Sequence, residues 1–133
     1  DAKAQSLHAG VEATRAAVPR DGLPLIVIHG ADDGLIPDAF SSSVYVQRAR
    51  AHGRDPRYWR IANAQHFDAF LGLPMLASRY VPLMPYAYRA LDAMWAHLQD
   101  DTPLPASAEV DATPRKADAS GIAPLRPDNV PMP

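Results

Sequence analysis

The chain has 133 residues, of which 47% are hydrophobic, with a formal net charge of −2 and no cysteine. This is the length of one ordinary domain, and the slightly acidic balance argues against a nucleic-acid partner, which would need a basic surface. Without cysteine, disulfide bonds and cysteine-ligated zinc are excluded. The longest apolar run, residues 23–28, is too short to span a bilayer, so no membrane partner is expected. Residues 1–4 have no signal-peptide character, and composition alone leaves the compartment open.

The first expected element is a helix at residues 2–18, which Pro19 and Gly22 end. Its apolar side chains fall near one face: Ala4, Leu7, Val11 and Val18. Residues 23–28 then form an apolar run rich in branched side chains and without alternation. Such a run is typical of a strand that is buried on both faces, as in a parallel sheet.

A second helix is expected from Pro37 to about His52, with Gly53 at its C-terminal cap. Residues 57–62 form the next expected strand, and its bulky side chains favour that structure: Tyr58, Trp59 and Ile61. Strand, helix and strand within about 40 residues make a βαβ unit, which implies two parallel strands joined by a right-handed crossover.

After an irregular stretch at residues 66–85, a final helix is expected to end near Leu98. The helix is expected to pack on the sheet, and its apolar positions keep a period near 3.6: Ala87, Leu91, Met94, Trp95 and Leu98. Residues 102–133 differ in character, because they hold seven of the 14 prolines. This segment is interpreted either as a disordered tail or as an extended arm with spaced anchors at Val110, Ile122, Leu125 and Val130.

Two strands and three helices cannot cover both faces of a parallel sheet and hide its edges. More sheet must therefore come from elsewhere, most simply from the preceding part of the same polypeptide.

Asp33 and His66 are the candidate catalytic residues. Asp33 lies five residues after Ile28 and His66 five after Ile61, each in the loop that follows an expected strand. Because catalytic groups of parallel sheets gather beyond the carboxyl ends of the strands, the two side chains are expected to meet. His66 would act as general base and then general acid on a serine hydroxyl, and Asp33 would hold its Nδ1 proton. No Gly-x-Ser-x-Gly occurs in the chain, and the order serine, acid, base predicts that the nucleophile lies upstream.

The alternatives are weaker on spacing. Asp32 is the neighbouring carboxylate, but the Gly-x-x-Asp-x-x-x-Pro pattern selects Asp33. His29 with Asp33, or His66 with Asp68, lacks a third ligand at a persuasive distance in sequence, so no metal is expected. Three further histidines fall on expected helices and are predicted to face solvent: His8, His52 and His97. Residues 41–43, all serine, are interpreted as polar residues at a helix start. Four aromatic residues are interpreted as core: Tyr80, Tyr86, Tyr88 and Trp95.

Three segments, residues 27–37, 64–70 and 79–86, resemble the C-terminal region of D-(−)-3-hydroxybutyrate oligomer hydrolases. The similarity continues through residues 93–98 and the tail, and so covers essentially the whole chain. The resemblance implies an α/β fold that is the C-terminal part of an α/β-hydrolase, namely its last two parallel strands with flanking helices, plus a Pro-rich extended tail. Residues 1–101 would belong to the catalytic domain, and residues 102–133 would be the arm or tail.

The resemblance also implies a serine ester hydrolase that cleaves 3-hydroxybutyrate oligomers to monomers without a cofactor and is secreted or periplasmic. Asp33 and His66 match the acid and the base of the family, and four neighbouring residues are expected to line an apolar acyl slot: Leu35, Ile36, Phe67 and Phe70. The expected partners are a small ester substrate and the rest of the same polypeptide, which would supply the serine, so this chain alone should be inactive. The alternatives are another α/β-hydrolase esterase or peptidase, or a non-catalytic hydrolase-like fragment.

Overall fold

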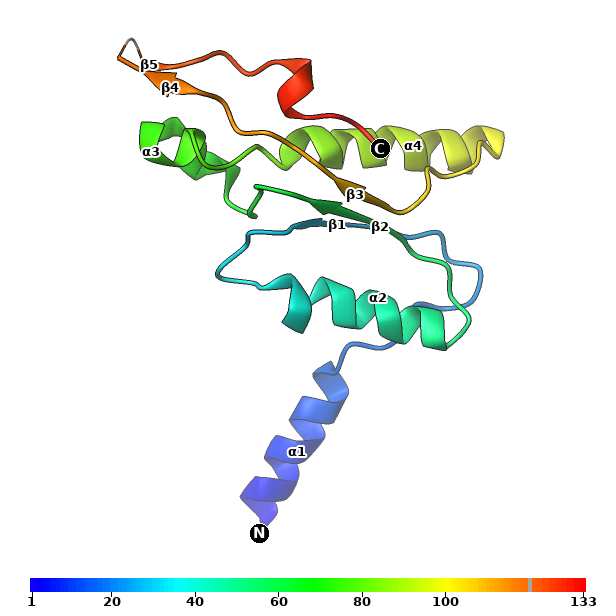
Figure 1. The fold of residues 1–133 in the computed structure, drawn as a ribbon. Coiled ribbons are helices and arrows are strands. Elements are labelled where there is room, and N and C mark those ends of the chain that lie inside the picture. Colours follow the sequence, from blue (N-terminus) through cyan, green and yellow to red (C-terminus); the bar gives the residue numbers. More distant parts are fainter. Residues whose placement is uncertain (120) are drawn as a thin grey trace.

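The protein is described here by a computed structural model that covers residues 1–119 and 121–133, so one position of the expected tail, residue 120, lies outside the described residues. The chain forms a layered α/β structure from which the first helix projects (Figure 1). The α-helices are α1 (Ala2–Thr14), α2 (Ser42–Ala51), α3 (Pro74–Ala77) and α4 (Met84–Asp100). The strands are β1 (Ile26–Gly30), β2 (Arg57–Ile61), β3 (Ala108–Val110), β4 (Ala117–Asp118) and β5 (Gly121–Ile122), and 3-10 turns lie at Asp38–Phe40, Asp68–Gly72 and Pro127–Asn129.

The main sheet has the order β1-β2-β3, and all its pairings are parallel. The expected parallel pairing of the first two strands is thus confirmed, with Val27 opposite Tyr58. Strand β1 begins three residues later than expected and continues through Gly30. Strand β3 was not predicted, because its three residues lie in a proline-rich segment and show no apolar run.

Helix α2 covers one face of this sheet and helix α4 covers the other (Figure 1). The helix expected from Pro37 is interrupted, since a 3-10 turn comes first and the α-helix starts only at Ser42. Asp38 causes the break, because it accepts a hydrogen bond from the backbone N–H of Ser43 and also contacts Tyr58 on β2. Gly53 follows α2 with a φ of 73°, as expected of a C-terminal cap.

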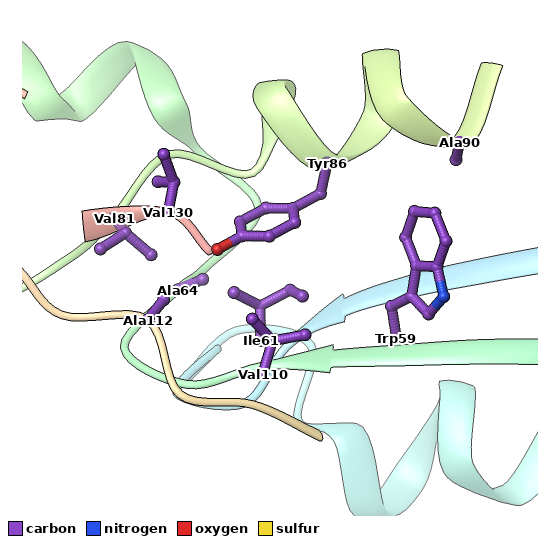
Figure 2. Packing of buried hydrophobic residues seen from close by; sticks show 9 residues of the cluster. All are labelled: Trp59, Ile61, Ala64, Val81, Tyr86, Ala90, Val110, Ala112 and Val130. Atoms are coloured by element: carbon purple, nitrogen blue, oxygen red, sulfur yellow. The ribbon is translucent and has the colours of Figure 1, made fainter. Parts of the chain in front are cut away.

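The hydrophobic core lies between the sheet and α4 (Figure 2). Trp59 and Ile61 of β2 and Tyr86 of α4 are fully buried there. The indole N–H of Trp59 donates to the backbone oxygen of Ala106 at 3.0 Å, so the largest core side chain also pairs its polar atom. Val130, near the end of the chain, packs into the same cluster.

Helix α4 packs on the sheet as expected, but the residues it buries are not the ones that keep the apolar period. Its buried residues are Tyr86, Ala90 and Ala93, whereas Leu91 and Trp95 are 65% and 68% exposed. Small residues at four- and three-residue spacing let the helix approach the sheet closely. The larger apolar side chains lie roughly a third of a turn further round the helix, and Leu91 and Met94 line a groove beside β1 with Ile26 and Ile28. Tyr88 and Trp95 are likewise exposed and not core.

Helix α1 has no buried residue and ends at Thr14, four residues earlier than expected. The apolar face proposed for it is therefore not buried against any described residue, and Leu7 is 71% exposed. The proline-rich segment runs beside α3 and α4 (Figure 1). Its proposed anchors differ in burial, since Val110 and Val130 are buried while Leu125 is 41% exposed. No helix of the described chain is long and apolar enough to cross a membrane.

Candidate active site

Two loops meet at the carboxyl edge of the parallel sheet, and Gly30 permits their close contact. A Cβ atom added at Gly30, the last residue of β1, would lie 2.4 Å from the backbone oxygen of Ala64 in the loop after β2. Asp32 joins the same loops, because its N–H donates to Ala64 at 3.1 Å and its carboxylate accepts from the N–H of Asn63 at 2.7 Å. Only a residue without a side chain allows this approach, so the glycine sets the spacing of the loops.

Asp33 and His66 lie in these two loops and contact each other. Oδ2 of Asp33 lies 2.5 Å from Nδ1 of His66 and also accepts from the His66 backbone N–H at 3.1 Å. Oδ1 of Asp33 accepts from the N–H groups of Leu35 and Ile36 at 3.0 and 2.9 Å. The Asp33 side chain is 3% exposed and that of His66 is 30% exposed. The structure thus brings the two expected residues together, with the carboxylate buried and the imidazole open to solvent.

The hydrogen bonds keep Asp33 ionised. Burial raises the pKa of Asp33, but bonds from the Ile36 N–H, the His66 ring, the Leu35 N–H and the His66 N–H prevail and hold this pKa below its usual value. An ionised carboxylate on Nδ1 favours the tautomer that carries its proton there. His66 Nε2 is then an acceptor, and it makes no hydrogen bond within the described part of the chain.

The side chains considered as alternatives have other partners. Asp32 bonds the backbone of the neighbouring loop and not His66. The Nδ1 atom of His29 on β1 lies 2.8 Å from Oγ of Ser42, the first residue of α2. Asp68 accepts from two backbone N–H groups at the start of α4. Of the residues that the structure describes, no three His, Asp or Glu side chains are grouped as metal ligands would be.

A mostly apolar hollow of about 330 Å³ adjoins Asp33. Three of the four expected lining residues line it: Leu35, Phe67 and Phe70. The Phe67 ring lies 3.8 Å from the His66 ring and 5.1 Å from the Phe70 ring, measured between centroids. Ile36 is not among the lining residues, and its contribution to the site is the N–H that binds Asp33.

Leu76 and Tyr80 are the large side chains of this hollow that were not predicted from the sequence. Leu76 belongs to α3, within a stretch that was expected to be irregular. Tyr80 was assigned to the core, but it is half-buried and contributes to the wall of the hollow. The sequence did hold one indication that Tyr80 belongs to the site, since it lies in residues 79–86, one of the segments that resemble the hydrolase family.

A buried carboxylate that holds a solvent-facing imidazole beyond the ends of parallel strands is typical of the acid–base pairs of hydrolases. Comparison of the sequence with models of known protein families identifies the family. Residues 1–132 match the family model described as 3HB-oligomer hydrolase, and the chain belongs to that family.

Several curated relatives carry the name D-(-)-3-hydroxybutyrate oligomer hydrolase. The relative from Paracidovorax citrulli (strain AAC00-1) is 44% identical over 138 residues, which cover 98% of this chain and 20% of the relative. That from Azoarcus sp. (strain BH72) is 40% identical over 136 residues, again 98% and 20%. The chain therefore spans about a fifth of the length of the curated relatives it matches. No solved structure matches significantly.

Proposed function

We propose that this chain is the acid–base segment of a serine ester hydrolase that cleaves 3-hydroxybutyrate oligomers to monomers. The contact between Asp33 and His66 carries the proposal, because four donors orient one buried carboxylate and leave one imidazole nitrogen free. The names of the relatives support the substrate class. The nucleophilic serine and the oxyanion-hole donors would come from sequence outside these 133 residues, so the chain alone would be inactive.

In the proposed mechanism, His66 Nε2 takes the proton from the serine hydroxyl as the serine oxygen attacks the ester carbonyl carbon. The tetrahedral intermediate collapses, its carbon–oxygen ester bond breaks, and the same proton passes to the leaving alcohol oxygen. Water then attacks the acyl-enzyme by the same route and releases the acid and the free serine. Asp33 stays ionised throughout, in agreement with its lowered pKa, and stabilises the imidazolium that forms twice in the cycle.

The hollow beside Asp33 suits the methyl and methylene groups of such a substrate. Its walls include the side chains of Leu35, Phe67 and Phe70 and are mostly apolar. Ile36 remains a proposed neighbour of the substrate, since its side chain is 47% exposed at the same loop. An apolar site with a few placed polar groups is the usual form of a small-molecule site.

The remainder of the polypeptide is proposed to complete an α/β-hydrolase fold against β1. Strand β1 is an edge of the described sheet. Because Leu25 and Ala31 bond toward β2, alternation turns the backbone N–H and C=O groups of Ile26 and Ile28 to the free edge. Beside this edge lies an apolar groove of about 370 Å³, to which the exposed Leu91 of α4 also contributes. A further strand with a covering apolar segment would satisfy both features.

Secretion or export to the periplasm is also part of the proposal, on the family resemblance alone. Cell fractionation with an antibody against this segment tests it, and recovery of the protein only from the cytoplasm would contradict it.

The chemistry is tested on the intact polypeptide that carries these residues. It should hydrolyse the dimer and trimer of 3-hydroxybutyrate, and a fluorophosphonate should label one serine outside residues 1–133, found by peptide mapping. His66→Ala should slow the labelling strongly, because the serine then lacks its base. Hydrolysis of other short esters in preference to these oligomers would favour a related esterase, and absence of both labelling and turnover would favour a non-catalytic fragment.

A further inference from the structure

The apolar hollow beside Asp33 shares wall residues with a second, more polar hollow. Asp32 and Tyr80 line both of them, and the second has a volume of about 350 Å³. Asn63, Ser78 and Arg79 contribute to the walls of the second hollow. Two hollows that share wall residues lie next to each other, so the second is the nearest site for the far end of a ligand that is too long for the first.

Arg79 supplies the positive charge of the second hollow. The backbone N–H groups of Arg79 and Tyr80 both donate to the oxygen of Leu76, at 3.0 and 2.9 Å, which fixes the turn after α3. The guanidinium carbon of Arg79 lies 5.8 Å from the centroid of the Tyr80 ring, within the range of a cation–π contact. The arginine is exposed and forms no salt bridge with any carboxylate that the structure describes. Asp32, on the same wall, is already bonded to the Asn63 N–H.

The proposed substrate has one charged group. A 3-hydroxybutyrate oligomer ends in a single carboxylate, and that carboxylate always lies on the alcohol side of the ester bond that is cleaved. A guanidinium binds a carboxylate through two parallel N–H donors, and this makes arginine a more directional partner than lysine. Arg79, which pairs with no carboxylate among the described side chains, thus lies in the hollow next to the one beside Asp33.

We infer that Arg79 binds the terminal carboxylate of the oligomer and thereby makes the protein selective for free-acid substrates. This inference rests on the proposed function. It assigns the apolar hollow to the alcohol side of the cleaved ester, where the sequence had suggested an acyl slot. His66 would then protonate the near end of a leaving group whose far end Arg79 holds, and esters close to the carboxyl terminus would be cleaved in preference to distant ones.

The test compares two substrates of equal length, the 3-hydroxybutyrate dimer as the free acid and as its methyl ester. In the intact polypeptide, Arg79→Gln should lower kcat/KM for the free acid about tenfold, mainly through KM, and change that for the methyl ester less than twofold. Arg79→Lys should recover part of the loss because it keeps the charge without the planar fork. Inhibition by the product 3-hydroxybutyrate should weaken in parallel. Arg89→Gln, at an exposed arginine of α4, is the matched control and should change neither substrate.

The outcomes separate this inference from the proposed function. If the unmodified polypeptide hydrolyses both dimers but Arg79→Gln leaves both unchanged, or impairs both equally, carboxylate binding by Arg79 is refuted and the hydrolase proposal stands. If the unmodified polypeptide hydrolyses neither dimer, the proposed function fails and the inference fails with it.

Discussion

Replacement of Asp33 by asparagine tests the geometry of the acid–base pair most directly. Each carboxylate oxygen of Asp33 accepts two hydrogen bonds, Oδ1 from Leu35 and Ile36 and Oδ2 from the backbone and ring of His66. An amide has one acceptor oxygen only. If that oxygen keeps the Leu35 and Ile36 donors, the new NH₂ group faces His66, and the ring must turn Nδ1 into an acceptor. The proton then sits on Nε2, where it prevents action as a base.

Asp33→Asn should therefore change both the turnover rate and the stability. The tautomer change should lower kcat by about 10⁴-fold, the effect expected when the acid of such a pair is made neutral. The His66 backbone N–H loses its acceptor, which costs about 1–3 kcal/mol of stability near neutral pH. Because the folded-state pKa of Asp33 lies below its unfolded value, the stability that this carboxylate contributes is present above the unfolded pKa and is lost as the pH falls through the folded pKa. The stability difference between the two proteins should therefore shrink in acid.

The assay is kcat for the 3-hydroxybutyrate dimer with the intact polypeptide, together with urea unfolding at pH 7 and pH 3. Asp32→Asn is the matched control, because its amide oxygen still accepts from Asn63 and His66 is untouched; its kcat should stay within a few-fold. If Asp33→Asn retained activity within tenfold, or if Asp32→Asn lost as much, the assignment of the acid would be wrong.

Three further predictions concern the surroundings of the pair. Gly30→Ala should lower the free energy of unfolding by about 1–3 kcal/mol and reduce kcat, because the new Cβ meets a backbone oxygen at 2.4 Å. Gly34→Ala is the control and should change little, because its Cβ meets nothing within 4 Å. Equal urea midpoints and equal kcat for the two variants would contradict this prediction. If a further segment covers the groove beside β1, Leu91→Lys should destabilise the intact polypeptide by about 2 kcal/mol or more. Tyr88→Lys, on the outer side of α4, should cost less than about 0.5 kcal/mol. Equal changes in melting temperature for the two variants would mean that no segment covers the groove. Asp38→Asn should lower stability at pH 7, and the loss should diminish in acid, because burial raises the pKa of this carboxyl but its hydrogen bonds hold it below the usual value; a loss that does not vary with pH would refute this role.

The acid–base pair could be placed from the sequence because its signals are local. Neither the branched run before His29 nor the aromatic strand around Trp59 depends on distant contacts. The same holds for the fixed offset of Asp33 and His66, the candidate catalytic residues, from these strands. Parallel pairing of adjacent strands then brings Asp33 and His66 together. Strand β3 has no such local signal. Its three residues form a strand only because they pair with the edge of β2, and this pairing is a tertiary contact that a local pattern does not reveal.

The same distinction explains which face of α4 packs on the sheet. The periodicity that selected Leu91 and its neighbours was correct as a pattern, because these residues do share one face. Periodicity cannot say what the face contacts, and the described sheet contacts the adjacent face of Tyr86, Ala90 and Ala93 instead. The unfilled face looks onto the groove beside the open edge of β1, the side on which a completed sheet would continue. An apolar face that packs on none of the described residues therefore supports the proposal that more of the polypeptide lies beside the open edge of β1.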